Sequence, residues 1–350
     1  MRRILYIDYI QQKGHVNFHR IHIDALKREG YNVKLVLHRD IAQQLPYPKK
    51  DYILVLPSFL DQHARSPLLN RVIFLLTLIY IKICVRLKRD DKVIIACLDE
   101  ITLGLLPLKK HMNIICHGNA NGFSNPIKHF FLKKLARNNS FIVFNEYMAR
   151  PFKENSVNDV HIISHGCPPA FIFEDVLLPI ELHKFNKVIF HPSSKANAKF
   201  VCQLISHPVL SDILKENKVL LLLRNKPMGL ENTENIRFLN HYLTQQQYRQ
   251  LFLRADIILL AYPDSFKYQV SGVSFECIAN QKKILISNHP SLQYCCQYYN
   301  YDPTFTDIND FCNKIQKLIN NKEMRCTVSP SLLVPDYTSI FKLLRPCKYQ

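Results

Sequence analysis

The sequence lacks the patterns that most directly mark a metal or disulfide protein. Its 11 cysteines include no Cys-x-x-Cys pair, and the neighbours Cys295 and Cys296 are too close for an ordinary disulfide. This cysteine usage predicts a reducing compartment and no zinc site. An Asp-x-Asp motif is also absent, so we expect no bound metal.

Long apolar runs are missing as well. Residues 1–10, MRRILYIDYI, contain no signal-peptide core, so we expect a cytoplasmic protein. The longest apolar stretch, residues 72–85, is interrupted by Lys82 and is shorter than the roughly 20 residues of a membrane-spanning helix. We expect a helix over residues 68–87 that either packs in the core or lies in a membrane interface. Four basic residues flank this helix: Arg71, Arg86, Lys88 and Arg89.

Negative charge is scarce. Lysine and arginine number 46 against 28 aspartates and glutamates, which gives a formal net charge of +18. The basic residues are scattered in small groups, without the interleaved aromatic residues of a nucleic-acid groove. Nucleic acid is therefore not an expected partner. An anionic membrane face and an anionic substrate such as a nucleotide diphosphate both fit this charge, which does not choose between them.

Short apolar runs alternate with amphipathic segments along the chain. Alternating strands and helices are typical of α/β domains in which helices cover both faces of a parallel sheet. The expected strands of the first half lie at residues 4–8, 33–37, 52–56, 93–97, 114–116, 141–144 and 162–163. Those of the second half lie at residues 188–190, 219–223, 236–239, 257–261 and 284–287.

A proline-rich segment near residues 165–187 divides this alternation into two halves. We expect an α/β protein with two Rossmann-like lobes whose parallel sheets face a central cleft. The predicted parts are an N-terminal domain over residues 1–167, a linker over 168–187 and a C-terminal domain over 188–334. A closing helix within 335–350 could pack back on the N-terminal domain.

The most informative segment is ADIILLAYPDSFKYQVSGVSFECIANQKKILIS, residues 255–287. A strand leads into a polar loop, and Ser271 and Gly272 then open a helix. The tip of a helix presents unpaired N–H groups to an anion, and a glycine lets a phosphate approach the backbone closely. Glu276 follows one turn later and could accept ribose hydroxyls. The plainer alternative is that Ser271 only caps the helix and that Glu276 is a solvated side chain.

This segment resembles the donor-site signature of glycosyltransferase family 4 and its GT-B relatives. The matching residues, in order, are Asp256, Tyr262, Pro263, Ser271, Gly272 and Glu276. The resemblance implies that Glu276 binds the ribose of a nucleotide sugar and that the amides of Gly272 and Val273 meet its diphosphate. It also implies that no cofactor is needed.

Two departures from the family pattern concern the donor. Tyr268 stands where many members carry a glutamate that contacts the transferred sugar, so the sugar is not identified. The glycine-rich turn that often opens the second lobe is replaced by HPSSKANAKF, in which Lys195 or Lys199 could act instead.

Other candidate residues follow predicted strands, where α/β proteins bind ligands. Arg224 and Lys226 could neutralise a departing diphosphate. His117 resembles a histidine that faces the donor sugar in family-4-like enzymes. The remaining candidates are contacts for the acceptor or the sugar, namely Gly14, His15 and Asn119.

The resemblance implies a glycosyltransferase that moves a sugar from a nucleotide-sugar donor to a glycan or lipid-linked acceptor. Retention of configuration, independence of metal and a role in surface polysaccharide biosynthesis at the inner face of the membrane are expected with it. Two alternatives stay open. One is a degenerate GT-B module that binds nucleotide sugar without turnover, and the other is a sugar-nucleotide epimerase of the same shape.

Overall fold

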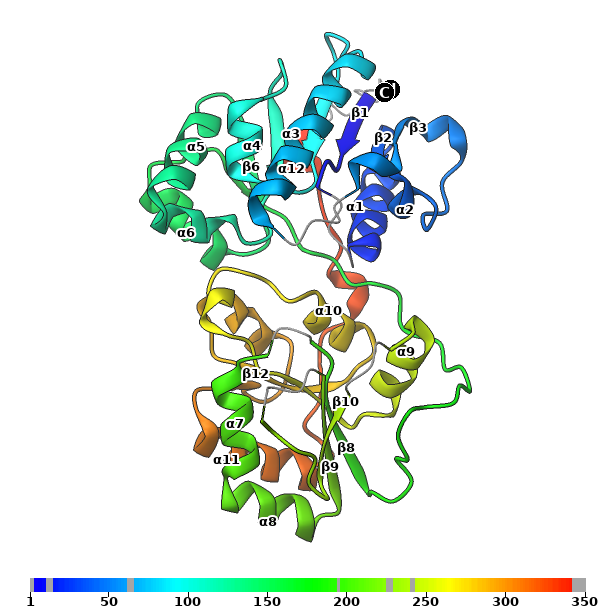
Figure 1. Ribbon diagram of the computed structural model, residues 1–350, viewed down its shortest axis with the longest axis vertical. Coiled ribbons are helices and arrows are strands. Elements are labelled where there is room, and N and C mark those ends of the chain that lie inside the picture. The colour runs from blue at the N-terminus through cyan, green and yellow to red at the C-terminus, as the bar shows by residue number, and fades with distance from the viewer. Residues whose placement is uncertain are drawn as a thin grey trace, which may run out of the picture. The chain divides into compact units, whose positions relative to one another are not determined.

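The computed structural model describes residues 3–10, 15–61, 66–193, 196–224, 229–239 and 243–341. The chain forms two compact units (Figure 1). The first, here called the N-unit, comprises Met1–Gly166 together with Leu333–Gln350. The second, the C-unit, comprises Cys167–Leu332.

A parallel sheet of seven strands forms the centre of the N-unit. Its strand order is β3-β2-β1-β4-β5-β6-β7. The order reverses between β1 and β4, and such a switch point opens a crevice at the carboxyl ends of the strands. The strands are β1 (Arg3–Ile7), β2 (Asn32–His38), β3 (Tyr52–Leu56), β4 (Lys92–Ile95), β5 (Met112–Ile115), β6 (Ser140–Val143) and β7 (Val160–Ile162).

Three helices of the N-unit begin where the sequence supplies a cap. The side chains of Asp99, Asn125 and Asn145 each accept a hydrogen bond from a backbone N–H in the first turn of the next helix. The helices are α1 (Val16–Arg28), α2 (Arg39–Ala42), α3 (Pro67–Cys84), α4 (Glu100–Leu105), α5 (Pro126–Ala136), α6 (Glu146–Glu154) and, from the end of the chain, α12 (Thr338–Phe341).

Tyr337, just before α12, anchors the segment after the C-unit inside the N-unit. Tyr337 is fully buried, and its hydroxyl lies 2.7 Å from Nδ1 of His22 in α1. The backbone N–H of Tyr337 also donates to the carboxylate of Glu29 at 2.8 Å. These contacts explain why residues more than 300 positions apart in the sequence belong to one unit.

The C-unit repeats the same architecture with a parallel sheet of six strands. Its order is β10-β9-β8-β11-β12-β13, so the switch point lies between β8 and β11. The strands are β8 (Lys187–His191), β9 (Val219–Arg224), β10 (Ile236–Leu239), β11 (Ile257–Leu260), β12 (Lys283–Ser287) and β13 (Thr304–Phe305).

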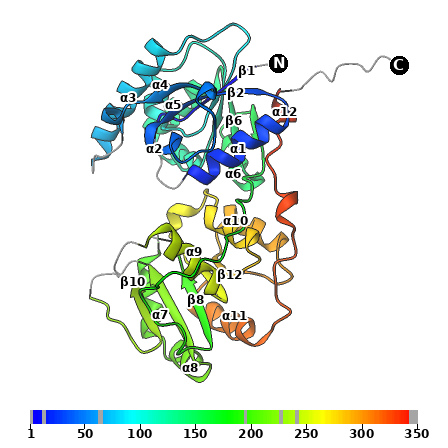
Figure 2. The same ribbon diagram turned by 90° about the vertical axis from the view of Figure 1, so that its right-hand side faces the viewer.

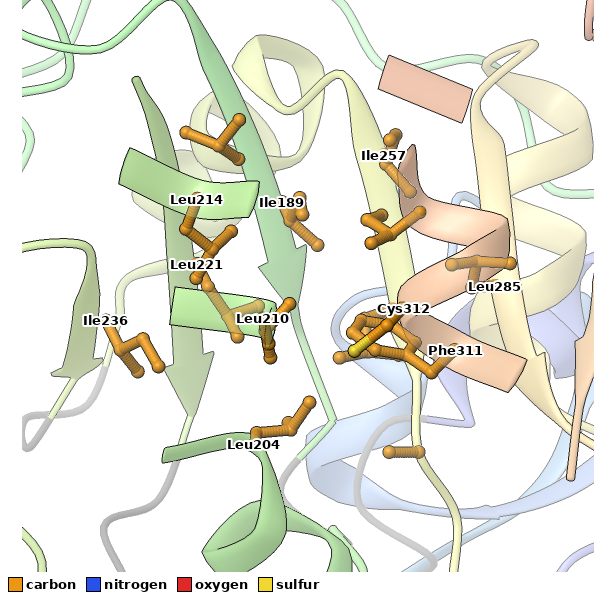
Figure 3. Close-up of a cluster of buried hydrophobic side chains, with 14 of the residues drawn as sticks. Ile189, Leu204, Leu210, Leu214, Leu221, Ile236, Ile257, Leu285, Phe311 and Cys312 are labelled. Carbon is orange, nitrogen blue, oxygen red and sulfur yellow. The ribbon is translucent and has the colours of Figure 1, made fainter. Parts of the chain in front are cut away.

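The core of the C-unit lies between its sheet and three helices: α7 (Ala198–Ser206), α8 (Pro208–Glu216) and α11 (Ile308–Asn320). Figure 3 shows Leu210 and Leu214 of α8 and Phe311 of α11 beside the strand residues Leu221 and Leu285. All five side chains are fully buried, and each contributes about 1.5–3 kcal/mol of burial free energy. Two further helices, α9 (Gln245–Arg254) and α10 (Gly272–Ala279), contact β8 and β12 respectively.

The predicted fold class is confirmed: the protein is α/β, with two parallel sheets of Rossmann-like order. Thr244 and Gln247 form a capping box at the start of α9. No helix or strand interrupts residues 163–186, the proline-rich stretch. The ends of the predicted strands agree with the observed ones to within two residues, and those of β3 and β10 match; hydrophobicity alone does not fix where a ladder stops.

Helix α3 differs from its prediction in length and in burial. It ends at Cys84 rather than near residue 87, because Val85 is extended and buried. Only one face, which carries Phe74, Leu78 and Ile81, packs inside the unit, so α3 is not an ordinary core helix. By length and composition α3 is long and apolar enough to cross a membrane: its 18 residues have a mean hydropathy of 1.7, and 22% of them are buried.

Candidate functional site

The candidate site of the C-unit forms where β8 and β11 end. Asn197, in the segment after β8, donates its backbone N–H to the carbonyl of Ala261 at 2.9 Å. The next residue, Tyr262, is buried and stacks on Phe266 with ring centroids 4.0 Å apart. Its hydroxyl lies 2.6 Å from Oγ of Ser271. The stack and the hydrogen bond fix the loop between β11 and α10 at the switch point of the sheet.

Ser271 is the N-cap of α10. Its Oγ accepts a hydrogen bond from the backbone N–H of Ser274 at 3.2 Å, and the residue is 2% exposed. Because this oxygen is also hydrogen-bonded to the hydroxyl of Tyr262, Ser271 holds the tip of α10 in place. Ser271 therefore caps α10.

Gly272 is the first residue of α10 and is exposed. A Cβ built on it would meet nothing within 4 Å, so the space in front of the helix tip is open. Within the described residues, the N–H groups of Gly272 and Val273 have no hydrogen-bond acceptor. Open N–H groups at the positive end of a helix dipole form an anion site.

Glu276 lies one turn further along α10, and it is not a freely solvated side chain. Its Oε2 accepts a hydrogen bond from the hydroxyl of Tyr248 in α9 at 2.7 Å. Burial raises the pKa of Glu276 to about 7, against the opposing effect of the Tyr248 hydrogen bond and the charge of Arg249. A carboxylate with unused lone pairs can accept hydrogen bonds from a diol, and it does so when ionised.

Sequence reasoning missed Tyr248 and His191. Tyr248 precedes Glu276 by 28 residues, and nothing in its own segment marks it as a partner. His191 ends β8 at the switch point and is fully buried. Burial lowers the pKa of His191 to about 4, so its imidazole is neutral at physiological pH. Its position at a strand end is the one signal that could have identified it.

Arg224 ends β9, and its guanidinium donates to the carbonyl of Pro192, just after β8, at 3.1 Å. This bond places a cation beside the loop at the switch point. Tyr268 is half-buried in the loop before α10, with the ammonium of Lys267 5.3 Å from its ring centroid. Lys199 is exposed in α7. The predicted residues Lys226 and Lys195 lie outside the described residues.

The candidate site of the N-unit follows β5. Nε2 of His117 lies 3.0 Å from the carbonyl of Ala96, so this nitrogen carries the proton and Nδ1 is an acceptor. Burial lowers the pKa of His117 well below its usual range, and His15 adds to the effect. The His117 ring is 4.5 Å from the rings of both His15 and Phe18. The structure therefore brings His15 and His117 together.

Cys97 completes a potential metal cluster with these two histidines. The ligand atoms of His15, Cys97 and His117 all lie within 4.8 Å of one another, and Nδ1 of His15 is 3.6 Å from Sγ of Cys97. Burial raises the pKa of Cys97 well above its usual range, and Asp8 adds to the effect. Because the thiolate and not the thiol binds metals, this thiol is a weak ligand in its present surroundings.

The side chain of Asn119 forms hydrogen bonds within the protein that the sequence did not indicate. Its side-chain amide donates to the carbonyl of Leu98 at 3.0 Å and to Oε1 of Glu100 at 2.8 Å. Both amide hydrogens are thus used, which leaves only Oδ1 for a ligand. Gly14, the remaining predicted residue of this group, lies outside the described residues.

Neither a known protein family nor a curated protein matches this sequence. Solved structures do match in fold. An α,α-trehalose-phosphate synthase (UDP-forming) from Burkholderia vietnamiensis gives a TM-score of 0.60 at 10% identity over 92% of each chain. UDP-GlcNAc 2-epimerase from Methanocaldococcus jannaschii gives 0.56 at 11% identity, over 94% of this chain and 95% of that chain. TarM gives 0.51 at 17% identity, over 71% of this chain and 52% of its own.

These matches include a trehalose-phosphate synthase and a UDP-GlcNAc 2-epimerase, at identities that establish shared architecture alone. Together with the two parallel sheets, they show that this chain has the two-lobed GT-B fold.

Proposed function

We propose that this protein is a glycosyltransferase that takes a sugar from a nucleotide-sugar donor held by its C-unit. The observation that carries the proposal is the form of α10. Its open tip at Gly272 offers N–H groups to a diphosphate, and a half-buried carboxylate at Glu276 follows four residues later. Four residues of helix span about 6 Å, which suits a phosphate at the tip and a ribose one turn along.

The leaving group of such a reaction is a nucleoside diphosphate, which needs cations. Arg224 is already oriented toward the switch point by its bond to Pro192, and Lys226 is its proposed partner. Fixed charges of this kind stabilise the departing phosphate in the transition state. We therefore propose a metal-independent reaction. His117, neutral at working pH, is proposed to accept a hydroxyl hydrogen of the sugar through Nδ1, and His15 to contribute to the same group.

The proposal extends to the acceptor, a glycan or lipid-linked glycan of surface polysaccharide synthesis. Retention of configuration and hexosyl transfer are proposed on the family resemblance. Support for a membrane-bound acceptor comes from α3, which exposes a row of apolar side chains: Leu68, Leu69, Val72, Leu76, Ile79 and Ile83. A cytoplasmic protein that meets the inner membrane face through this helix fits the net charge of +18.

Epimerisation and binding without turnover are the competing functions, and one assay separates them. Purified protein is incubated with a panel of nucleotide sugars, with and without glycan acceptors. Free nucleotide with a glycosylated acceptor indicates transfer, and an epimerised donor without nucleotide release indicates an epimerase. Binding with neither product indicates a degenerate module. Only the first outcome supports the proposal.

The same assay is run with Glu276→Ala. Leaving ribose hydroxyls unpaired costs about 1–3 kcal/mol, so donor affinity should fall by roughly 5- to 150-fold. Glu181→Ala is the matched control, because Glu181 is an exposed carboxylate of the same unit whose ion-pair partner among the described residues is Lys184. Equal donor affinity in the two variants would remove Glu276 from the site.

A further inference from the structure

A cavity of about 500 Å³ lies in the N-unit beside the carboxyl-terminal end of α3. Its volume is within the range of small-molecule pockets. Apolar side chains form most of its wall: Ile7, Ile81, Val85, Leu87 and Leu108. None of them belongs to the candidate residues for the donor or the acceptor described above.

Two lysines complete the wall of this cavity, Lys82 and Lys109. Both are exposed, and within the described part of the chain neither has an ion-pair partner. The neighbouring Lys110, in contrast, donates to the backbone carbonyl of Lys88. An apolar wall with two unpaired ammonium groups complements a molecule that has a hydrocarbon part and an anionic group.

The cavity continues a surface that is itself apolar. Ile81 and Val85 face the cavity, while Ile79 and Ile83 of the same helix end are 44% and 77% exposed. Figure 2 shows α3 at the outer edge of the N-unit. Phe59, 74% exposed, lies beside Tyr80 of α3 and adds to this surface. Exposed apolar patches of this kind mark interaction sites.

We propose that the cavity is a binding site for an anionic, phosphate-bearing lipid. Lys82 and Lys109 bind the phosphate, and the hydrocarbon next to it lies against Val85, Leu87 and Leu108. A lipid in this site would hold the outer face of α3 against the leaflet. The inference deepens the membrane contact within the proposed function, and it does not depend on the sugar-transfer chemistry.

The first test measures binding of a soluble short-chain lipid, dihexanoyl phosphatidic acid, by calorimetry. Dihexanoyl phosphatidylcholine and inorganic phosphate are the comparison ligands. We expect the wild type to bind the phosphatidic acid at least about tenfold more tightly than either. Equal binding of inorganic phosphate would show a simple anion site without a lipid pocket and would overturn the proposal.

The second test uses the double variant Lys82→Gln/Lys109→Gln. Lys317→Gln/Lys322→Gln is the matched control, since it removes the same charge from exposed lysines of the C-unit. We expect the first variant to lose about tenfold or more in binding both to the short-chain lipid and to phosphatidic-acid vesicles, while the control retains both. Wild-type affinity in the first variant would contradict the lipid site.

The experiments distinguish failure of the lipid site from failure of the proposed sugar transfer. If the protein pellets with anionic vesicles but does not bind the short-chain lipid, the result supports a membrane contact through α3 and contradicts the lipid site in the cavity. Absence of nucleotide release with every donor, with lipid binding intact, would reject sugar transfer and leave the pocket in place.

Discussion

At the scale of single residues, Glu276 is the side chain whose surroundings best support its proposed role. Burial and the hydroxyl of Tyr248 oppose each other at this carboxyl group, and its pKa comes to about 7. A carboxyl group that titrates near neutrality is costly to keep ionised in the fold, and perturbed groups of this kind gather at functional sites. The structure thus supplies a reason, beyond motif resemblance, to place a ligand at this position.

Donor affinity should therefore depend on pH through Glu276. The ionised form accepts ribose hydroxyls, so affinity is highest above pH 7 and falls as the carboxyl group is protonated toward pH 6. Calorimetric titration of the nucleotide-sugar donor measures the effect, since its diphosphate is esterified at both ends and stays fully ionised across this range.

Tyr248→Phe provides a second arm of the pH experiment. Loss of its hydrogen bond to the ionised form should raise the pKa of Glu276 and move the affinity midpoint to higher pH. Glu276→Gln should remove the dependence. A pH profile that is identical in all three proteins would show that another group titrates.

At the scale of elements, α10 depends on a cap that was visible in the sequence and on contacts that were not. Ser271 and Gly272 follow a strand and a polar loop, so the helix and its start could be predicted. The hydrogen bond between Tyr248 of α9 and Glu276 of α10 joins two helices that are 28 residues apart in the sequence. Local propensity carries no information about such tertiary contacts.

Gly272→Ala separates stability from ligand binding at this element. The new Cβ meets no protein atom within 4 Å, and alanine is the better helix former, so the free energy of unfolding should rise by up to about 1 kcal/mol. Donor affinity should fall at least about tenfold, because the methyl group occupies the space proposed for the diphosphate. Chemical denaturation and calorimetry measure the two effects.

Ser211→Ala, within α8, is the matched control for the alanine substitution. It also places an alanine in a helix of the C-unit, but α8 ends just before β9 begins, at the end of the sheet opposite the site, so it should raise stability slightly and leave donor affinity unchanged. Donor binding by Gly272→Ala at wild-type strength would place the phosphate elsewhere.

At the scale of the whole molecule, the sequence predicted the class of fold because both sheets are built from short, mostly apolar strands separated by helical segments. It could not predict which polar side chains would find protein partners. Asn119 turned out to bond Glu100 and Leu98 rather than remain free. Helix α6 contains Pro151, and helices with an internal proline are poorly marked in sequence. The sequence also did not predict which face of α3 is exposed, because that depends on how the opposite face packs in the N-unit.

The proposed chemistry of the molecule needs no metal, which a chelator can test. Turnover after treatment with EDTA should stay within about twofold of the untreated rate, since fixed cations neutralise the leaving group. Steady-state kinetics with the best donor from the panel provide the measurement. Loss of turnover that returns with added zinc would contradict metal independence and direct attention to His15, Cys97 and His117.

The pairing of Glu276 with the ribose is the central claim, and a thermodynamic cycle tests it most directly. Wild type and Glu276→Ala are each titrated with the preferred nucleoside diphosphate and with its dideoxy analogue, which lacks the ribose hydroxyls. Removal of the hydroxyls should cost the wild type about 1–3 kcal/mol of binding free energy and cost the variant almost nothing. An equal loss in both proteins would contradict the pairing of Glu276 with the ribose.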